Sequence, residues 1–174
     1  EANSPAAKAG LRAGDTILEV NNRPVDNFVD WAKEVAGRGL EKVTLKIFRG
    51  GRAVQVTVTL QAEDKVFNSK LLKKRLGLDI RTLTEGLSKQ LGMSFYGGYL
   101  ITDVEKGGPG EKAGLERGAV IQRVDDQQPE SLVSFARNIH GRKAGDTVKL
   151  SVVLEIRRGS FLQRRSGIAN VKIR

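Results

Sequence analysis

Cysteine is absent from the sequence, and histidine occurs once, as His140. Without a thiol the chain can form no disulfide framework, no cysteine-based zinc site and no thiol nucleophile. A single histidine likewise excludes a metal site built from several imidazoles, so we expect neither a metal nor a cofactor. Long apolar runs are also missing, because no stretch reaches the roughly 20 residues that span a bilayer.

Aromatic residues make up only 5% of the sequence and are not interleaved with basic ones. Because RNA-binding surfaces stack bases on aromatic side chains, sequence-specific binding of nucleic acid is not expected. The 20 acidic residues are outnumbered by 30 basic ones, which gives a net charge of +10. Such a charge attracts anionic lipid or an acidic peptide, but a soluble surface rich in lysine and arginine explains it equally well. A role at a membrane surface therefore has only weak support.

The sequence contains a long internal repeat. The stretch SPAAKAGLRAGDTILEVNNRPV, residues 4–25, returns as GPGEKAGLERGAVIQRVDDQQP, residues 108–129. Gly14 aligns with Gly118, and the other matches keep the same offset of 104 residues (118 minus 14). A chain of 174 residues with 39% hydrophobic side chains suffices for two small domains. The repeat therefore indicates a duplicated domain rather than a short solenoid period.

Each copy predicts the same order of elements. A short helix ends at Gly10 or Gly114, an alternating strand follows, and NNRPV or DDQQP supplies turn chemistry. A second helix then carries an apolar stripe at spacing i, i+3, i+4, i+7. The stripe residues are Phe28, Trp31, Ala32 and Val35 in the first copy and Leu132, Phe135, Ala136 and Ile139 in the second.

A pair of strands completes each copy. Residues 43–60 alternate around a Gly-Gly turn as a hairpin, and residues 147–174 form its counterpart with a longer, basic connection at 157–165. We interpret the basic connection as a solvated hairpin tip, with contact to an acidic partner, lipid headgroups or a neighbouring subunit as the alternative. Between the copies, residues 63–74 are polar and charged, and we interpret them as a linker with some helix near its end.

Only the second copy is preceded by further strand patterns. LGLDIRTLT and GGYLITDVE predict strands on either side of a helical turn in EGLSKQLGM. The second copy also departs from the first, because Gly108-Pro109-Gly110-Glu111 replaces Ser-Pro-Ala-Ala and Ala119 replaces Asp15. Since an aspartate at such a place forms a turn, we expect local adjustment rather than loss of the fold.

With these motifs the chain resembles the tandem PDZ domains of bacterial HtrA/Deg-type serine proteases. The resemblance rests on SPAAKAGLRAGDTILEVNNRPV and on the order in which RLGLDI and GGYLITDVE precede the second copy. It implies an α+β fold of two small, partly open β-barrels or sandwiches, each capped by two helices, in the permuted bacterial topology. The implied boundaries are a first domain at 1–62 that lacks its leading loop and strand, a linker at 63–74 and a complete second domain at 75–174.

A serine-protease triad cannot be assembled from this sequence. The sole histidine, His140, lies at the end of a predicted helix, and no Gly-x-Ser-Gly-Gly stretch is present. Since a triad needs a base within hydrogen-bond reach of its nucleophile, the chain is expected to be non-catalytic, although the resemblance implies a serine endopeptidase as its parent. We interpret His140 as a solvated helix-end residue, with recognition of a peptide side chain as the alternative.

By resemblance, a peptide binds to the second domain by adding a strand to a sheet edge. Its terminal carboxylate would meet loop amides, and Gly77 would allow close backbone approach there. Leu132 and Ala136 would face the groove more than Phe135, although an apolar stripe of this kind also serves as core. The implied site residues are Arg75, Leu76, Gly77 and Leu78 in the loop, Asp79, Ile80 and Arg81 in the strand, and Leu132, Phe135, Ala136 and Ile139 in the helix.

The resemblance implies capture of hydrophobic C-termini or unfolded segments for a protease domain of the same parent chain. Regulation and assembly of a homo-oligomer are related roles, and the implied location is the bacterial periplasm or cell envelope. Two alternatives stay open, namely the PDZ pair of a site-two membrane metalloprotease and a PDZ adaptor without a protease. A Gly-x-Ser-Gly-Gly stretch or a His-Glu-x-x-His helix upstream of Glu1 would decide between them.

Overall fold

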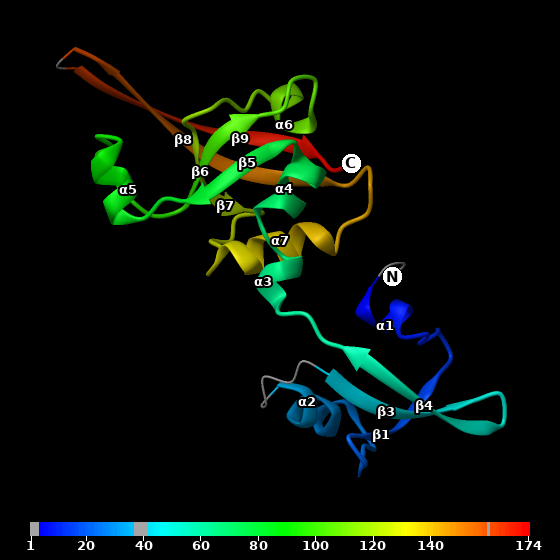
Figure 1. Cartoon of the computed structure of the whole chain (residues 1–174). Helices are drawn as coiled ribbons and strands as arrows, with labels where there is room; N and C mark the ends of the chain where they lie inside the picture. Colours follow the sequence, from blue (N-terminus) through cyan, green and yellow to red (C-terminus); the bar gives the residue numbers. More distant parts are fainter. Residues whose placement is uncertain (1–3, 37–41, 160) are drawn as a thin grey trace. The chain divides into compact units, whose positions relative to one another are not determined.

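The computed structural model describes residues 4–36, 42–159 and 161–174. The chain divides into two compact units, Glu1–Ala62 and Glu63–Arg174, and each is described by itself (Figure 1). Residues 63–74, which the sequence assigned to a linker, form helices that pack within the second unit. No helix in the described part of the chain is long and apolar enough to cross a membrane.

The described residues of the first unit form a four-stranded sheet and two helices. The strands lie in the order β2-β1-β3-β4. In β3 the residues Val43, Leu45 and Ile47 are buried while their neighbours are mostly exposed, which is the period of a half-buried strand. The elements are α1 (Pro5–Lys8), β1 (Thr16–Val20), β2 (Arg23–Pro24), α2 (Phe28–Ala36), β3 (Lys42–Arg49) and β4 (Arg52–Thr59).

The second unit is a five-stranded antiparallel sheet in the order β5-β6-β7-β8-β9. Its helices are α3 (Glu63–Val66), α4 (Ser69–Leu76), α5 (Glu85–Gln90), α6 (Pro109–Lys112) and α7 (Leu132–His140). Its strands are β5 (Leu78–Thr82), β6 (Tyr99–Val104), β7 (Val120–Val124), β8 (Thr147–Arg158) and β9 (Phe161–Lys172). The predicted α+β class is confirmed, and both sheets are open rather than closed into barrels.

The two faces of the second sheet carry separate cores. Ile101 and Ile121 belong to the main core with α4 and α7, whereas Leu100 and Val120 belong to a smaller core beneath α5. Neighbouring residues of a strand point to opposite faces, so this division follows directly from the alternation of the sequence. The main core, which includes Phe135, is the one that borders the candidate site.

The two copies of the repeat share two features of the backbone. A register shift interrupts the pairing of β1 with β3 after Ile17, and the same shift interrupts β7 and β8 after Ile121. The turn that follows the strand is left-handed at Asn21 and Asn22 and again at the Asp125-Asp126 pair. Asparagine and aspartate tolerate this conformation better than other non-glycine residues, as the turn chemistry predicted.

The replacement of Asp15 by Ala119 leaves the turn intact. Asp15 N–H donates to the carbonyl of Arg12 at 3.2 Å, and Ala119 N–H donates to the carbonyl of Glu116 at 3.3 Å. In the first unit the Asp15 carboxylate also binds the Arg49 guanidinium at 2.5 and 2.6 Å. The turn is retained because the backbone hydrogen bond is present in both copies, although Asp15 additionally accepts from Arg12 N–H at 2.8 Å.

Candidate functional site

Strand β5 is an edge of the second sheet, and β6 is its one partner strand among the described residues. On the β6 side, the carbonyl of Gly77 accepts from Glu105 N–H at 2.9 Å, and Leu83 N–H donates to Gly98 at 3.0 Å. Because alternate residues of a strand direct their N–H and C=O groups to opposite sides, Leu78 and Ile80 present theirs to the free edge. This edge has the geometry needed to accept an added strand.

Helix α7 carries the apolar stripe that the sequence predicted. The helix begins with a capping box in which Ser131 Oγ accepts from Ser134 N–H at 3.1 Å and Ser134 Oγ accepts from Ser131 N–H at 3.0 Å. Its residues Phe135, Ala136 and Ile139 are buried, and Leu132 packs against the same core. The structure therefore brings the four predicted helix residues into one cluster with Leu78 and Ile80 of β5.

Helix α4 lies between β5 and α7 and contacts both (Figure 1). Its residues Leu72 and Leu76 are 0% exposed and belong to the same core as the α7 stripe. Asn68 caps the helix by accepting hydrogen bonds from Lys70 and Leu71 N–H at 3.0 and 3.3 Å. Leu76, expected in a ligand-binding loop, is therefore the last residue of a packed helix.

Gly77 links α4 to β5 in the left-handed conformation, at φ +69°. Its N–H donates to the carbonyl of Lys73 at 2.9 Å and so caps the helix. The expectation was that amides of this loop meet a peptide carboxylate and that Gly77 allows the close approach, and in this structure the Gly77 amide serves α4. A Cβ atom at Gly77 would lie 3.2 Å from Pro109 Cδ and 3.4 Å from Gly108 Cα, so the loop is closely packed against α6.

Arg75 fastens the C-terminal end of α4 to two distant backbone groups. Its guanidinium donates to the carbonyl of Arg174 at 2.8 Å and to the carbonyl of Arg142. In the part of the chain that the structure describes, the Nε atom of Arg75 is buried without a hydrogen-bond partner. Arg75, which was expected in the ligand-binding loop, thus holds the helix in place.

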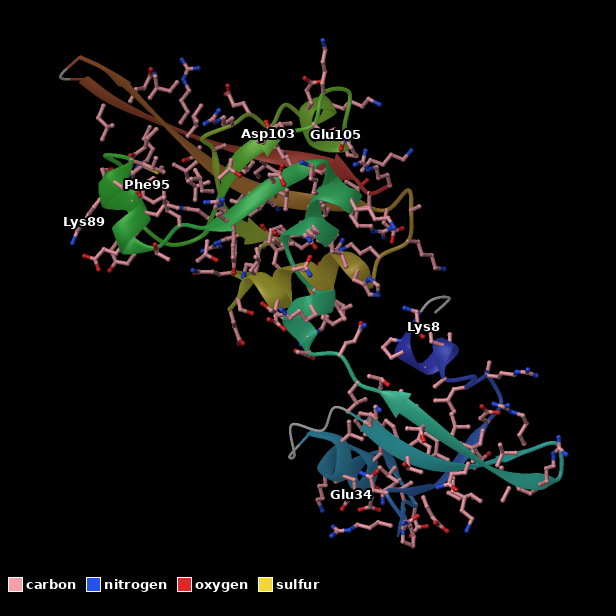
Figure 2. All side chains as sticks on the ribbon, viewed as in Figure 1. Lys8, Glu34, Lys89, Phe95, Asp103 and Glu105 are labelled. Atoms are coloured by element: carbon pink, nitrogen blue, oxygen red, sulfur yellow. The ribbon has the colours of Figure 1, made fainter. Side chains whose placement is uncertain are left out.

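Further charged side chains fix the same helix end. The Arg174 guanidinium donates to the Lys74 carbonyl at 2.6 Å and to the Glu105 carboxylate at 2.9 Å (Figure 2). Lys73 Nζ lies 2.7 Å from the Asp79 carboxylate, and this hydrogen bond raises the pKa of Lys73. Asp79, a predicted strand residue, therefore pairs with α4, whereas Arg81 of the same strand is exposed.

The residues that precede α4 in the sequence, Glu63 and Phe67, are held against α7. The rings of Phe67 and His140 meet edge to face with centroids 5.3 Å apart. The Arg137 guanidinium lies 5.5 Å from the centre of the Phe67 ring and also forms an ion pair with Glu63. His140 was interpreted as a solvated helix-end residue, but the structure places it half-buried against Phe67.

The basic hairpin formed by β8 and β9 is tied to the loop that follows α5. Glu155 accepts from Ser94 N–H and from Arg164 Nη2, both at 2.9 Å. The Arg164 guanidinium lies 4.9 Å from the ring of Phe95, which Figure 2 labels beside α5. Burial raises the pKa of Glu155, but the hydrogen bonds from Ser94 and Arg164 outweigh it and hold the pKa below its ordinary value. The segment 157–165 was predicted to be a solvated hairpin tip, but its residue Arg164 is held by Glu155.

The corresponding helix of the first unit exposes the apolar residues at its start. Phe28 and Val29 of α2 are 78% and 58% exposed, and Phe28 and Trp31 border an open pocket with Ile17. Within residues 4–36 and 42–62 no helix or strand corresponds to α4, β5 or β6. No cluster of three metal-ligating side chains occurs among the described residues of either unit.

Comparison with known proteins identifies the fold of both units. Models described as "PDZ domain" match residues 1–49 and 74–159. A probable periplasmic serine endoprotease DegP-like of Marinomonas sp. is 30% identical over 156 residues, which cover 87% of this chain and 33% of that protein. Periplasmic serine endoprotease DegP of Escherichia coli K12 is 28% identical over 160 residues, 90% of this chain and 30% of the relative.

A solved structure, the HtrA-type protease AlgW with decapeptide, aligns at 22% identity with a TM-score of 0.46 and covers 78% of this chain and 42% of that one. The curated relatives are much longer than this sequence. The chain spans about a third of their length.

Proposed function

The chain consists of two PDZ domains homologous to those of DegP/HtrA serine endoproteases, and from this we propose that it recognises peptides with its second domain. The proposed site is the groove between the free edge of β5 and helix α7. Its ligands are hydrophobic C-termini or unfolded segments, which pair with β5 and direct apolar side chains toward α7.

The observation that carries this proposal is the edge of β5, which has no second partner strand among the described residues and shares its core with the apolar helix α7. The outward N–H and C=O groups of Leu78 and Ile80 are suited to pairing with an extended backbone. Leu132, Phe135, Ala136 and Ile139 lie on the adjacent helix and supply the apolar wall. Main-chain pairing gives affinity and side-chain pockets give preference, so the ligand would be chosen by its last few side chains.

In the whole protein, we propose that the PDZ pair captures substrate, regulates a serine protease domain or contributes to oligomer assembly in the cell envelope. The support is that the homologues found are periplasmic serine endoproteases. The same relatives favour this assignment over a site-two metalloprotease or a stand-alone adaptor. The chain itself is proposed to be non-catalytic, since its one histidine has no Gly-x-Ser-Gly-Gly partner.

The test is a titration with a fluorescent peptide that ends in a hydrophobic residue, beside the same peptide amidated at its C-terminus. A single groove of this kind should bind the free peptide with a dissociation constant on the order of micromolar, and the amidated peptide more weakly.

The repeat offers a matched pair of variants, because Leu132 and Phe28 occupy equivalent positions of α7 and α2. Leu132→Lys should weaken binding by about tenfold or more, because it places an unpaired charge at the apolar wall. Phe28→Lys should leave it unchanged. Equal binding of both peptides, or equal loss in both variants, would contradict the proposed site.

A further inference from the structure

The space that a bound peptide needs is filled by the chain itself. A strand added to β5 lies roughly 4.8 Å away in the plane of the sheet and directs alternate side chains toward α7. Helix α4 contacts both walls, and its residues Leu72 and Leu76 pack into the same core as Ile80 and Ala136. An incoming strand and a docked α4 therefore compete for the same apolar surface.

Helix α4 is docked by its inner face, by its two ends and by the ion pair of Lys73 with Asp79. Leu72 and Leu76 are spaced i, i+4 and buried, whereas Lys70, Lys73 and Lys74 on the outer face are exposed. A helix of eight residues is marginal by itself in water, so α4 keeps its form only while it is docked. Gly77, already in the left-handed region, is the point about which the segment could swing without moving β5.

We propose that α4 is an internal occupant of the groove and that the second domain binds peptide only after α4 undocks. This inference rests on the proposed function, because it concerns the same groove. The Phe67–His140 contact and the Glu63–Arg137 ion pair hold the segment at one end, and Arg75 holds it at the other. Because apparent affinity is reduced by the fraction of molecules in the closed state, these contacts set the strength of peptide binding.

A cysteine-free chain allows a direct test by tethering. Glu63 and Arg137 have exposed side chains that meet in an ion pair, one on α3 and one on α7. The double variant Glu63→Cys/Arg137→Cys, bridged by a short bis-maleimide reagent, should hold the segment on α7 and weaken peptide binding at least tenfold. The same double variant without the bridge is the control, and because it lacks the Glu63–Arg137 ion pair it should bind at least as tightly as the unmodified chain.

A loosening variant tests the opposite direction. Phe67→Ser removes the ring that contacts His140 and Arg137, and it should tighten peptide binding several-fold by populating the open state. Val66→Ser is the matched control, because Val66 is a neighbour that does not pack against the main core among the described residues. Hydrogen exchange of the α4 amides, measured with and without peptide, reports undocking independently of affinity.

The outcomes separate this inference from the function on which it rests. Weaker binding in the bridged chain, tighter binding in Phe67→Ser and faster α4 exchange with peptide support both. Equal binding by bridged and unbridged chains overturns the inference and leaves the proposed function standing. If Phe67→Ser speeds exchange of α4 and still no variant binds peptide, the open groove is not a peptide site, and both proposals are wrong.

Discussion

Gly110 in α6 should not tolerate even one added methyl group. A Cβ atom there would overlap Leu78 Cδ2 and lie 2.9 Å from Leu78 Cγ, closer than such contacts occur, and it would lie a tight 3.1 Å from the Leu76 carbonyl oxygen. Leu78 is completely buried and cannot move aside, and the carbonyl belongs to the backbone. The equivalent residue of the first copy is Ala6. The close packing at Gly110 explains why the second copy departs from Ser-Pro-Ala-Ala at this position.

The magnitude follows from two opposing effects. Overpacking a filled interior costs about 1–3 kcal/mol, whereas replacing glycine by alanine inside a helix gains up to about 1 kcal/mol. The gain is smaller in the first turn of a four-residue helix, so Gly110→Ala should destabilise the second unit by about 1–2 kcal/mol. With a urea slope of about 2 kcal/mol per molar, the midpoint of unfolding should fall by about 0.5–1 M.

The sequence provides both the control and the assay. Gly86 lies in α5 with nothing within 4 Å of an added Cβ, so Gly86→Ala should raise the midpoint instead. The single tryptophan, Trp31, reports the first unit, whereas both tyrosines, Tyr96 and Tyr99, report the second. Tyrosine-detected unfolding should shift and tryptophan-detected unfolding should not. A midpoint that rises in Gly110→Ala as it does in Gly86→Ala would refute the packing argument.

Two further predictions concern ionised groups. The hydrogen bond from Arg49 lowers the pKa of Asp15 from 3.8 to about 2. The stabilisation that the ionised Asp15 gives to the first unit is therefore present above pH 3.8 and is lost as the pH falls toward 2. Acid titration followed by tryptophan fluorescence should show this loss, and Asp15→Asn should abolish this part of the pH dependence. Glu155→Gln should release the loop at Ser94 and the hairpin at Arg164. The expected result is faster hydrogen exchange confined to these two segments, and unchanged exchange there would contradict the prediction.

The strands, the turns and the apolar helix were predictable because their signals are local. Leu132, Phe135, Ala136 and Ile139 follow the helical period, and the turns at Asn21 and Asp125 use residues that suit a left-handed backbone. Each of these features depends on neighbours a few residues away. The fold class follows from them without knowledge of which surfaces meet.

The position of α4 was not predictable for the opposite reason. Asn68 and Gly77 mark the two ends of a helix, and Leu72 with Leu76 gives it an apolar side. Nothing in that short stretch indicates that the apolar side packs on α7, because the partner surface lies far along the chain. Arg75 is a similar case, since its guanidinium binds carbonyl groups 67 and 99 residues away. Local sequence showed the charge but not its partner.

The covalent continuity of α4 with β5 through Gly77 has a consequence for the time course of binding. A helix that leaves the groove stays attached at its edge, so it returns as a tethered competitor with an effective concentration of about millimolar. At high peptide concentration the observed association rate should therefore level off at the rate of helix departure instead of rising without limit. The peptide that stays bound longest, rather than the one that arrives fastest, would then hold the groove.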